Sequence, residues 1–407
     1  MKRVAIVNAF YPPDRAFTGI SASRLVEHLC AAIPQLEVSV FATDQSYRGG
    51  SVAVSHGHHV ERISASYRGS HRLLRLAGSL WDGWRLARRA CREADLVIAM
   101  TDPPLLGLWV SLASRKRGVR WMEWTMDLFP EAFAAAGLVN PEGLLYRCLN
   151  AVLRRCLPER YICLGPLQYE FLRSRRQSDV PWFNLPCGPS AIEHAAPPEW
   201  KRPGAVTLAY VGNLGEAHSA DVIAAIVSRA DSAHTHFVFA PYGARRQRLL
   251  ELTRDCPNVT WKEHLPPAEL AHADVHLVSL CGHWSHICVP SKSATAMGMG
   301  RPILFAGLPD TDVWREFGAA GWLIPEQPGG TYRIADIDLA LRSIENAGEL
   351  AHRTRQAQLL GGQLQNSEWH YRQKIAGWVS EVLLGEVMPE REEAPAGAVA
   401  PATAARA

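Results

Sequence analysis

The sequence predicts an α/β protein with two doubly wound halves, each a parallel sheet with helices on both faces. Short apolar runs alternate with helix-like segments along the chain, which is typical of parallel sheets. A stretch rich in Pro, Gly and Ala, residues 187–204, interrupts the pattern, which then begins again. At 407 residues the chain is also too long for one ordinary core. We therefore expect two Rossmann-like domains, with ligands bound in the cleft between them.

The strands and helices expected from the apolar pattern divide the chain into five segments. The first half has expected strands at Val4–Asn8, Val38–Ala42, Leu96–Met100, Arg120–Glu123 and Tyr161–Leu164. The second half has them at Val206–Val211, His236–Phe239, Val259–Lys262, Val275–Ser279 and Ile303–Ala306. Helices are expected at Ser21–Ala32, Ser219–Ser228, Ser291–Met299 and Glu368–Leu384. The segments are an N-terminal domain (1–186), a linker (187–204), a C-terminal domain (205–367), a final helix (368–386) and a disordered tail (387–407).

Composition narrows the function classes. The chain is 47% hydrophobic and 20% charged, which is typical of soluble globular proteins, and it has no apolar run of about 18 residues that would indicate a membrane span. The N-terminus runs directly into a strand and lacks the apolar core of a signal peptide. Nine scattered cysteines form no Cys-x-x-Cys pair, so we expect no disulfide framework, no zinc site and a reducing cytoplasm.

A phosphate-binding site is the most specific chemical prediction for the second half. Ser291 and Lys292 open a predicted helix, where backbone N–H groups and the positive end of the helix dipole favour an anion. The dipole repels a cation at this end, so a bound anion best explains the lysine. The alternative is that Ser291 caps the helix and Lys292 is merely solvated.

A second strand-to-helix turn lies in the same half. In Gly212-Asn213-Leu214-Gly215, the glycines would let backbone amides approach a pyrophosphate, although an ordinary turn explains the pattern equally well. His218 follows this turn, and His283 and His286 precede the Ser291 helix. The histidines lack metal-ligand spacing, so we expect no metal and consider His218 and His286 candidate ligand contacts.

The first half offers carboxylates at the end of a predicted strand. Asp127 is the better candidate to orient or deprotonate a hydroxyl, and Glu131 is a candidate cleft contact that a helix start also explains. Gly19, in the turn after the first strand, is a further candidate cleft contact or an ordinary turn residue.

The first half is also basic, with 24 Lys/Arg and 16 Asp/Glu in residues 1–190, which indicates an anionic partner. Residues 68–92 hold seven arginines and one acid, and apolar side chains at helical spacing. We expect either a core helix with a charged back or a surface for anionic membrane. The candidate membrane residues are Arg75, Trp81, Trp84, Arg85 and Arg89. No basic run has the form of a nucleic-acid motif, and we expect no nucleic-acid partner.

These motifs together resemble the retaining glycosyltransferases of family 4, which have the two-domain GT-B fold. The resemblance is closest to the group that transfers sugars such as N-acetylfucosamine onto lipid-linked glycans. It spans most of residues 1–385 and is carried by motifs in a fixed order: Tyr11-Pro12-Pro13, Asp102-Pro103-Pro104, Asp127 to Glu131, Gly212 to Gly215, Val289 to Lys292, and Met297 to Pro302.

The resemblance implies a nucleotide-diphosphate sugar donor, UDP-linked, as a co-substrate and no metal or other cofactor. Gly212, Asn213, Gly215, Ser291 and Lys292 would hold the diphosphate, and the acceptor glycan would bind the first half with Asp127 near its hydroxyl. The enzyme would be cytoplasmic and peripheral on the inner face of the cell membrane, acting in polysaccharide and cell-envelope biosynthesis.

The sequence departs from the family in two respects. The usual Arg and Lys after the Gly212 strand are replaced by Asn213 and residues such as His218, and two glutamates are replaced as well. The family commonly has two glutamates eight positions apart, which contact the transferred sugar and the ribose. Ile287 and Thr295 stand at the matching positions here, and Thr295 is therefore the candidate ribose contact. The departures leave two alternatives open, a catalytically inactive binding or assembly partner with a GT-B-like fold and a nucleotide-sugar epimerase.

Overall fold

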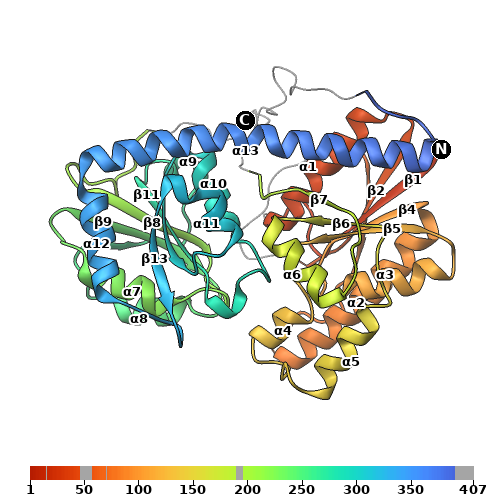
Figure 1. Cartoon of the computed structure of the whole chain (residues 1–407), viewed down its shortest axis with the longest axis horizontal. Coiled ribbons are helices and arrows are strands. Elements are labelled where there is room, and N and C mark those ends of the chain that lie inside the picture. The colour runs from red at the N-terminus through yellow and green to blue at the C-terminus, as the bar shows by residue number, and fades with distance from the viewer. Residues whose placement is uncertain (15, 46–56, 70, 189–195, 390–407) are drawn as a thin grey trace. The chain divides into compact units, whose positions relative to one another are not determined.

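The computed structural model describes residues 1–14, 16–45, 57–69, 71–188 and 196–389 (Figure 1). They pack as two compact units. Unit 1 contains Met1–Pro186 and the second half of the C-terminal helix, from Glu368, whereas unit 2 contains Cys187–Ser367. Most of the predicted tail, beyond residue 389, and residues 189–195 of the predicted linker lie outside the described residues. The predicted α/β class with two doubly wound sheets is confirmed.

Unit 1 is built on a seven-stranded sheet in the order β3-β2-β1-β4-β5-β6-β7, and all of its strand pairs are parallel. The chain winds outward in both directions from β1 and β4, so the carboxyl ends of these two strands flank the switch point, where doubly wound sheets bind ligands. The strands are β1 (Lys2–Val7), β2 (Leu36–Thr43), β3 (His59–Ile63), β4 (Leu96–Ala99), β5 (Arg120–Thr125), β6 (Arg160–Cys163) and β7 (Trp182–Asn184).

The helices of unit 1 cover both faces of this sheet (Figure 1). Right-handed crossovers put α1 on one face and the helices that follow β3, β4 and β5 on the other. Ala5 and Val7 of β1 accordingly share a core cluster with Leu86 of α2 and Val110 of α3. The helices are α1 (Phe17–Ala32), α2 (Arg72–Glu93), α3 (Leu106–Arg115), α4 (Glu131–Ala135), α5 (Leu144–Leu153) and α6 (Pro166–Arg176).

Unit 2 repeats the same strand order, β10-β9-β8-β11-β12-β13-β14, with its switch point between β8 and β11. Every pair is parallel except β13 with the short β14. The strands are β8 (Val206–Asn213), β9 (Thr235–Tyr242), β10 (Val259–Trp261), β11 (Val275–Ser279), β12 (Ile303–Gly307), β13 (Gly321–Gln327) and β14 (Thr331–Tyr332).

One large core holds unit 2 together. It joins Leu208 and Tyr210 of β8 to Ile223 of α7 and Leu341 of α12, all nearly or fully buried. The helices are α7 (Ala220–Arg229), α8 (Arg246–Thr253), α9 (Pro267–Leu270), α10 (Ser291–Gly298), α11 (Asp312–Phe317) and α12 (Ile334–Glu345), with short 3-10 turns at Gly282–Trp284 and Gly318–Ala320.

The C-terminal helix corrects one prediction. We expected it to start at Glu368, but α13 runs from Ala347 to Leu384. The pair Gly361-Gly362 breaks the apolar periodicity in the sequence, although it does not break the helix. A Cβ at Gly361 would collide with the backbone oxygen of Met297, so glycine here allows α13 to lie directly against α10. Close packing therefore accounts for a glycine within this helix.

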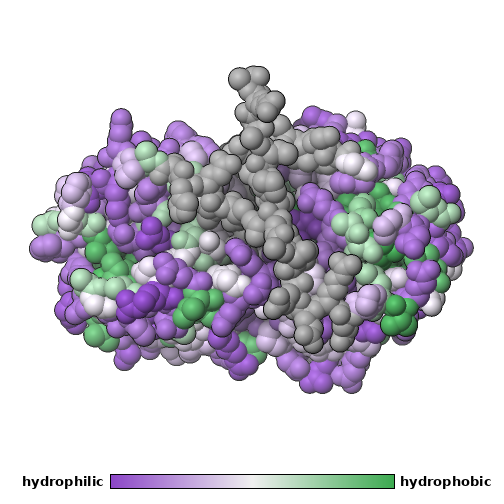
Figure 2. All heavy atoms as spheres, turned by 90° about the horizontal axis from the view of Figure 1, so that it is seen from above, coloured by the Kyte–Doolittle hydropathy of each residue, from purple (hydrophilic) through white to green (hydrophobic). Residues whose placement is uncertain are grey.

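Helix α2 corrects a second prediction, the extent of its apolar face. The predicted apolar face included Leu73 and Ala77, which are exposed, while the buried residues of the helix are in its second half, among them Leu86, Ala90 and Cys91. The described residues of α2 that belong to the core cluster of the sheet, from Leu86 to Cys91, all lie in this second half. Among the described helices, none is long and apolar enough to cross a bilayer. The face in Figure 2 shows hydrophobic side chains in small groups between hydrophilic ones.

Candidate functional site

The switch point of unit 2 brings several predicted residues together. Gly212 lies near the end of β8 with φ of +94°, a conformation that side chains with a Cβ rarely adopt. Among the described residues, the atom nearest to a Cβ at this position would be Cε of Lys292, at 3.6 Å. Gly215 lies beside the Asn213 side chain, 3.2 Å from Nδ2 to the position of a Cβ. The backbone of the Gly212 loop therefore lies directly under the lysine from α10.

Lys292 is the centre of this group. Its Nζ donates to the carbonyl oxygen of Asn213 at 2.7 Å and to Nε2 of His218 at 3.4 Å, and it lies 5.2 Å from the ring centroid of Tyr210. Burial lowers the pKa of Lys292 to about 8. An ammonium has three donors, so one N–H remains for a ligand. A desolvated cation with no carboxylate among its contacts in the described residues is well suited to an anion.

His218 supports the lysine as a neutral acceptor. Its Nδ1 donates to the carbonyl oxygen of Ser279 at 2.5 Å, which leaves Nε2 as the acceptor for the lysine. Burial and the neighbouring Lys292 lower the pKa of His218 to about 3. The imidazole is therefore uncharged at neutral pH and holds the ammonium in place without competing for its charge.

The start of α10 differs in detail from the predicted cap. Pro290 is the residue that precedes the helix, and no side chain caps it. Ser291 is the first helical residue, and its carbonyl oxygen accepts from the Thr295 hydroxyl at 3.0 Å. The predicted helix 291–299 is thus confirmed to within one residue, whereas the capping alternative for Ser291 is wrong. The first N–H groups of α10 remain without side-chain acceptors from this cap.

The neighbouring charges of unit 2 are paired. Arg245 lies 3.4 Å from Glu216, and Arg246 lies 2.9 Å from Glu263. His286, which is half-buried with φ of +65°, lies in the loop between β11 and α10. Within the described ranges, no three His, Cys, Asp or Glu side chains gather in a way that could hold a metal ion.

The switch point of unit 1 is polar as well. Asn8, which follows β1, is completely buried and its Nδ2 donates to the carbonyl oxygen of Phe10 at 2.7 Å. Gly19, in the first turn of α1, packs against this loop, because a Cβ there would lie 3.0 Å from the same carbonyl oxygen. Gly19 therefore lets α1 start directly at the carboxyl edge of the sheet.

Asp127 lies at this edge together with a second carboxylate that the sequence analysis left unassigned. Thr101, after β4, accepts at Oγ1 from the backbone N–H groups of Met126 at 3.2 Å and Asp127 at 3.0 Å. Burial and the Asp127 charge raise the pKa of Asp102 to about 7. Desolvation by the surrounding protein raises the pKa of Asp127 to about 6. Two interacting carboxyls with raised pKa values can donate and accept hydrogen bonds near neutral pH.

Glu131 is not on the surface of this edge. Its side chain is 2% exposed and pairs with Nη1 of Arg176 at 3.3 Å. Arg176 also donates to Asn150 Oδ1 at 3.1 Å and to the carbonyl oxygen of Phe129 at 2.7 Å. This buried pair anchors the segment after Asp127, so Glu131 has a structural contact where we expected a cleft contact.

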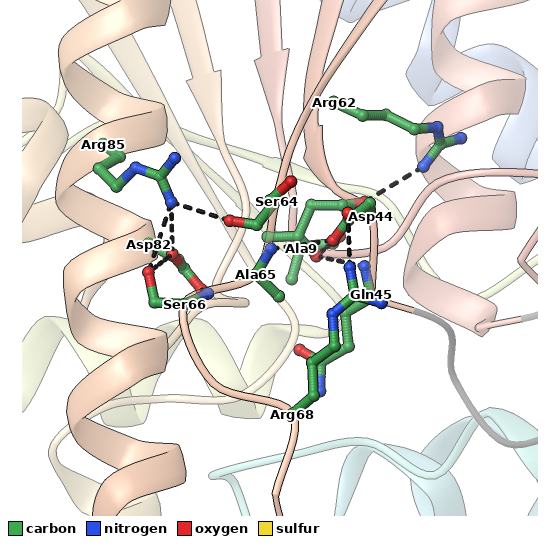
Figure 3. A network of polar contacts seen from close by, with 11 residues as sticks. Ala9, Asp44, Gln45, Arg62, Ser64, Ala65, Ser66, Arg68, Asp82 and Arg85 are labelled. Carbon is green, nitrogen blue, oxygen red and sulfur yellow. Dashed lines mark hydrogen bonds and ion pairs between the residues drawn. The ribbon is translucent and has the colours of Figure 1, made fainter.

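The predicted membrane residues divide into two groups. Arg85 donates to Ser64 O at 2.8 Å and to Asp82 at 3.1 Å, as Figure 3 shows, and Arg89 pairs with Glu61. Both arginines therefore tie α2 to the β3 segment. The other three are directed outward: Arg75 and Trp81 are exposed, and the ring of the half-buried Trp84 stacks on that of Trp81 at 4.7 Å.

Some contributors could have been found from the sequence and others could not. Asp102 follows a predicted strand in the same way as Asp127, so adjacent strand ends gave a usable signal. Arg176 is 45 residues from Glu131 along the chain, and nothing in the local pattern indicates that the two meet.

Comparison with known proteins supports the same architecture. No protein-family model matches the chain. Among curated proteins it is 28% identical over 239 residues to the probable glycosyltransferase WbjE of Pseudomonas aeruginosa. That match covers 54% of this chain and 59% of WbjE, so it spans less than two thirds of the relative's length.

Solved structures give broader coverage at lower identity. Sucrose-phosphate synthase of Thermosynechococcus elongatus covers 95% of this chain and all of its own (100%), with a TM-score of 0.73 and 13% identity. WaaG, a glycosyltransferase involved in lipopolysaccharide biosynthesis, covers 94% and 100% with a TM-score of 0.64 and 16% identity. HepE of Anabaena, solved with UDP-glucose, covers 94% and 100% with a TM-score of 0.63 and 13% identity. The chain therefore has the two-domain α/β fold of GT-B glycosyltransferase structures.

Proposed function

We propose that the chain is a glycosyltransferase that moves a sugar from a UDP-linked donor to a glycan acceptor. The single observation that carries the proposal is the half-buried Lys292 ammonium on the Gly212–Asn213 loop, at the switch point of unit 2. The resemblance to WbjE supports the activity, and the UDP-glucose complex of HepE supports the donor class.

The donor would bind to unit 2 through its diphosphate. Lys292 would offer its remaining N–H to a phosphate oxygen, and the first N–H groups of α10, which no side chain caps, would donate to the same diphosphate. Gly212 and Gly215 leave the loop backbone open to the pyrophosphate, and Thr295 lies one turn into the helix, where it would contact the ribose. These groups balance the charge of the leaving diphosphate, and in this proposal the reaction needs no metal.

The transfer would retain the configuration of the sugar, as in family 4. The acceptor hydroxyl oxygen forms a bond to the anomeric carbon on the face from which the diphosphate leaves. The bond from that carbon to the phosphate oxygen breaks, and the hydroxyl proton passes to the departing phosphate. Before transfer, ionised Asp127 orients the acceptor hydroxyl by accepting its hydrogen bond. That hydrogen bond breaks as the hydroxyl proton passes to the departing phosphate.

The acceptor class we propose is a lipid-linked or cell-surface glycan, as for the N-acetylfucosamine-transferase-like group. Such an enzyme would be cytoplasmic and peripheral on an anionic membrane. The excess of basic residues in the first half supports this partner. The role of WaaG in lipopolysaccharide biosynthesis supports an envelope glycan.

An epimerase acting on a nucleotide sugar is the second candidate. A putative UDP-N-acetylglucosamine 2-epimerase from Listeria monocytogenes shares the fold with a TM-score of 0.59. Incubation of the purified chain with a panel of nucleotide sugars separates the candidates. UDP release that requires an added acceptor supports transfer, interconversion of the free donor supports the epimerase, and binding without turnover supports an inactive assembly partner.

A further inference from the structure

The largest apolar side chains left exposed in unit 1 include two leucine pairs. Leu73 and Leu74 are 68% and 54% exposed, and Leu144 and Leu145 are 77% and 61% exposed. The first pair opens α2, and the second pair opens α5. Adjacent exposed leucines at the start of two helices are a costly feature for a surface that meets only water.

The topology puts both pairs at one edge of the same sheet. Helix α2 leads into β4 and α5 leads toward β6, so both helices run opposite to the strands and begin at the carboxyl edge. Right-handed crossovers put both on the same face, and α3 lies between them. Helix α3 contacts α2, and its Leu108 shares a cluster with Leu153 of α5. Figure 1 shows the three helices on one side of the sheet of unit 1.

Most charged residues near the leucines in the sequence are basic, although the exposed Glu142 lies two residues before the second pair. Arg75 follows the first pair and Arg147 follows the second, and both are exposed. Residues 103–122, which include α3, and 143–158, which include α5, contain no acidic residue. Arg85 and Arg89 of α2 are paired with carboxylates and so add little to this surface. Exposed leucines beside Arg75 and Arg147, for which the described residues show no ion pair, match the headgroup boundary of an anionic bilayer.

We infer that the first turns of α2 and α5 together dock unit 1 on an anionic lipid bilayer, with the leucine pairs inserted and Arg75 and Arg147 at the headgroups. Asp127 and Asp102 lie at the same carboxyl edge, so docking brings these carboxyls to the lipid surface. The inference rests on the proposed function in one respect, since it assigns a place to the lipid-linked acceptor. The proposed membrane contact lies at the starts of two helices and not in the middle of α2, where the sequence analysis expected it.

Vesicle co-sedimentation of the full chain tests this without donor or acceptor. The wild type is expected to bind phosphatidylcholine vesicles with 30 mol% phosphatidylglycerol (about one lipid in three), and to bind weakly to phosphatidylcholine alone. Leu144→Ser with Leu145→Ser, and separately Leu73→Ser with Leu74→Ser, should each lower the partition coefficient by at least about tenfold. Arg75→Gln with Arg147→Gln should lower it by about 25-fold, roughly fivefold for each arginine.

The matched control is Ile334→Ser with Leu339→Ser on α12 of unit 2, whose side chains are 59% and 62% exposed. Wild-type failure to bind anionic vesicles, or leucine variants that bind as well as this control, would overturn the inference. Leucine variants that convert a dimer to a monomer in sedimentation, with vesicle binding unchanged, would show a contact between copies and overturn it too. UDP binding by calorimetry is measured in parallel, so a failed docking surface and a failed transferase proposal give different results.

Discussion

The buried pair of Arg176 and Glu131 allows the sharpest test of how unit 1 positions Asp127. Replacing Arg176 by Met keeps an unbranched apolar stem but removes every donor, and it leaves the Glu131 carboxylate, 2% exposed, without its ion-pair partner. Removing one partner of a buried pair costs about 3–5 kcal/mol. The same substitution also removes the donor to Phe129 O, which lies two residues after Asp127.

Arg173 provides a control on the same helix. It pairs with Glu170 at 2.8 Å and Asp179 at 3.1 Å, but these side chains are about half or more exposed. Exposed pairs contribute about 0–1 kcal/mol, so Arg173→Met should change little. Glu131→Gln in the Arg176→Met background should recover part of the loss, because no buried charge is then left unpaired.

Hydrogen exchange measured peptide by peptide is the appropriate assay, since global unfolding of a two-unit chain mixes both transitions. For Arg176→Met, amides of β5 and of residues 126–133 should exchange faster by about 100-fold or more, in line with the expected loss, while those of unit 2 stay unchanged. Turnover should fall with the loss of order around Asp127. Exchange in β5 that matches the Arg173→Met control would refute the reasoning that this pair anchors the segment.

Three further outcomes follow from the two switch points. Lys292→Met should weaken UDP binding by about 1.5–3 kcal/mol, and wild-type binding, measured by calorimetry, should weaken as pH rises through about 8, where the ammonium loses its proton. Turnover should rise as pH increases through about 6, where Asp127 ionises, and Asp127→Asn should abolish that rise while leaving UDP affinity intact. Asp102 binds its proton more tightly in the folded state than in the unfolded state, so its contribution to stability falls as pH rises from about 4 to about 7. Asp102→Asn should therefore be more stable than the wild type at pH 8 but not at pH 4 in urea unfolding.

The sequence predicted the features that depend on short-range pattern. Buried parallel strands give uninterrupted apolar runs, so Val275–Ser279 was predicted with the bounds observed for β11, and the start of α10 was placed within one residue. The Gly212 turn and Lys292 were identified separately and the structure joins them, because both lie at strand ends that meet at one switch point. That inference needed only the general topology of doubly wound sheets.

The features that the sequence did not reveal depend on contacts between distant segments. Glu131 had the signature of a helix-start acid, and only the position of Arg176 shows why it is buried. The early start of α13 at Ala347 was also missed, and the contact that lets this part of the helix lie against α10, at Gly361 and Met297, joins residues 64 apart in the sequence. The apolar pattern of α2 extends through Leu73 and Ala77, but the residues of the helix that join the core cluster of the sheet begin at Leu86.

The two units share a strand order but differ in the chemistry of their switch points, and this difference bears on mechanism. In unit 2 a cation and open backbone amides meet, an arrangement that favours an anion such as a diphosphate. In unit 1 two carboxyls with raised pKa values and a buried amide meet, an arrangement that repels an anion and favours hydroxyl groups. Two copies of one topology with opposite preferences suit a reaction in which a charged donor and a neutral hydroxyl acceptor must be bound separately. A variant that moves the cation, Asp127→Lys, should therefore create UDP affinity in unit 1 without restoring turnover, and calorimetry on the Lys292→Met background would detect it. If no such affinity appears, charge alone does not determine which unit binds the donor.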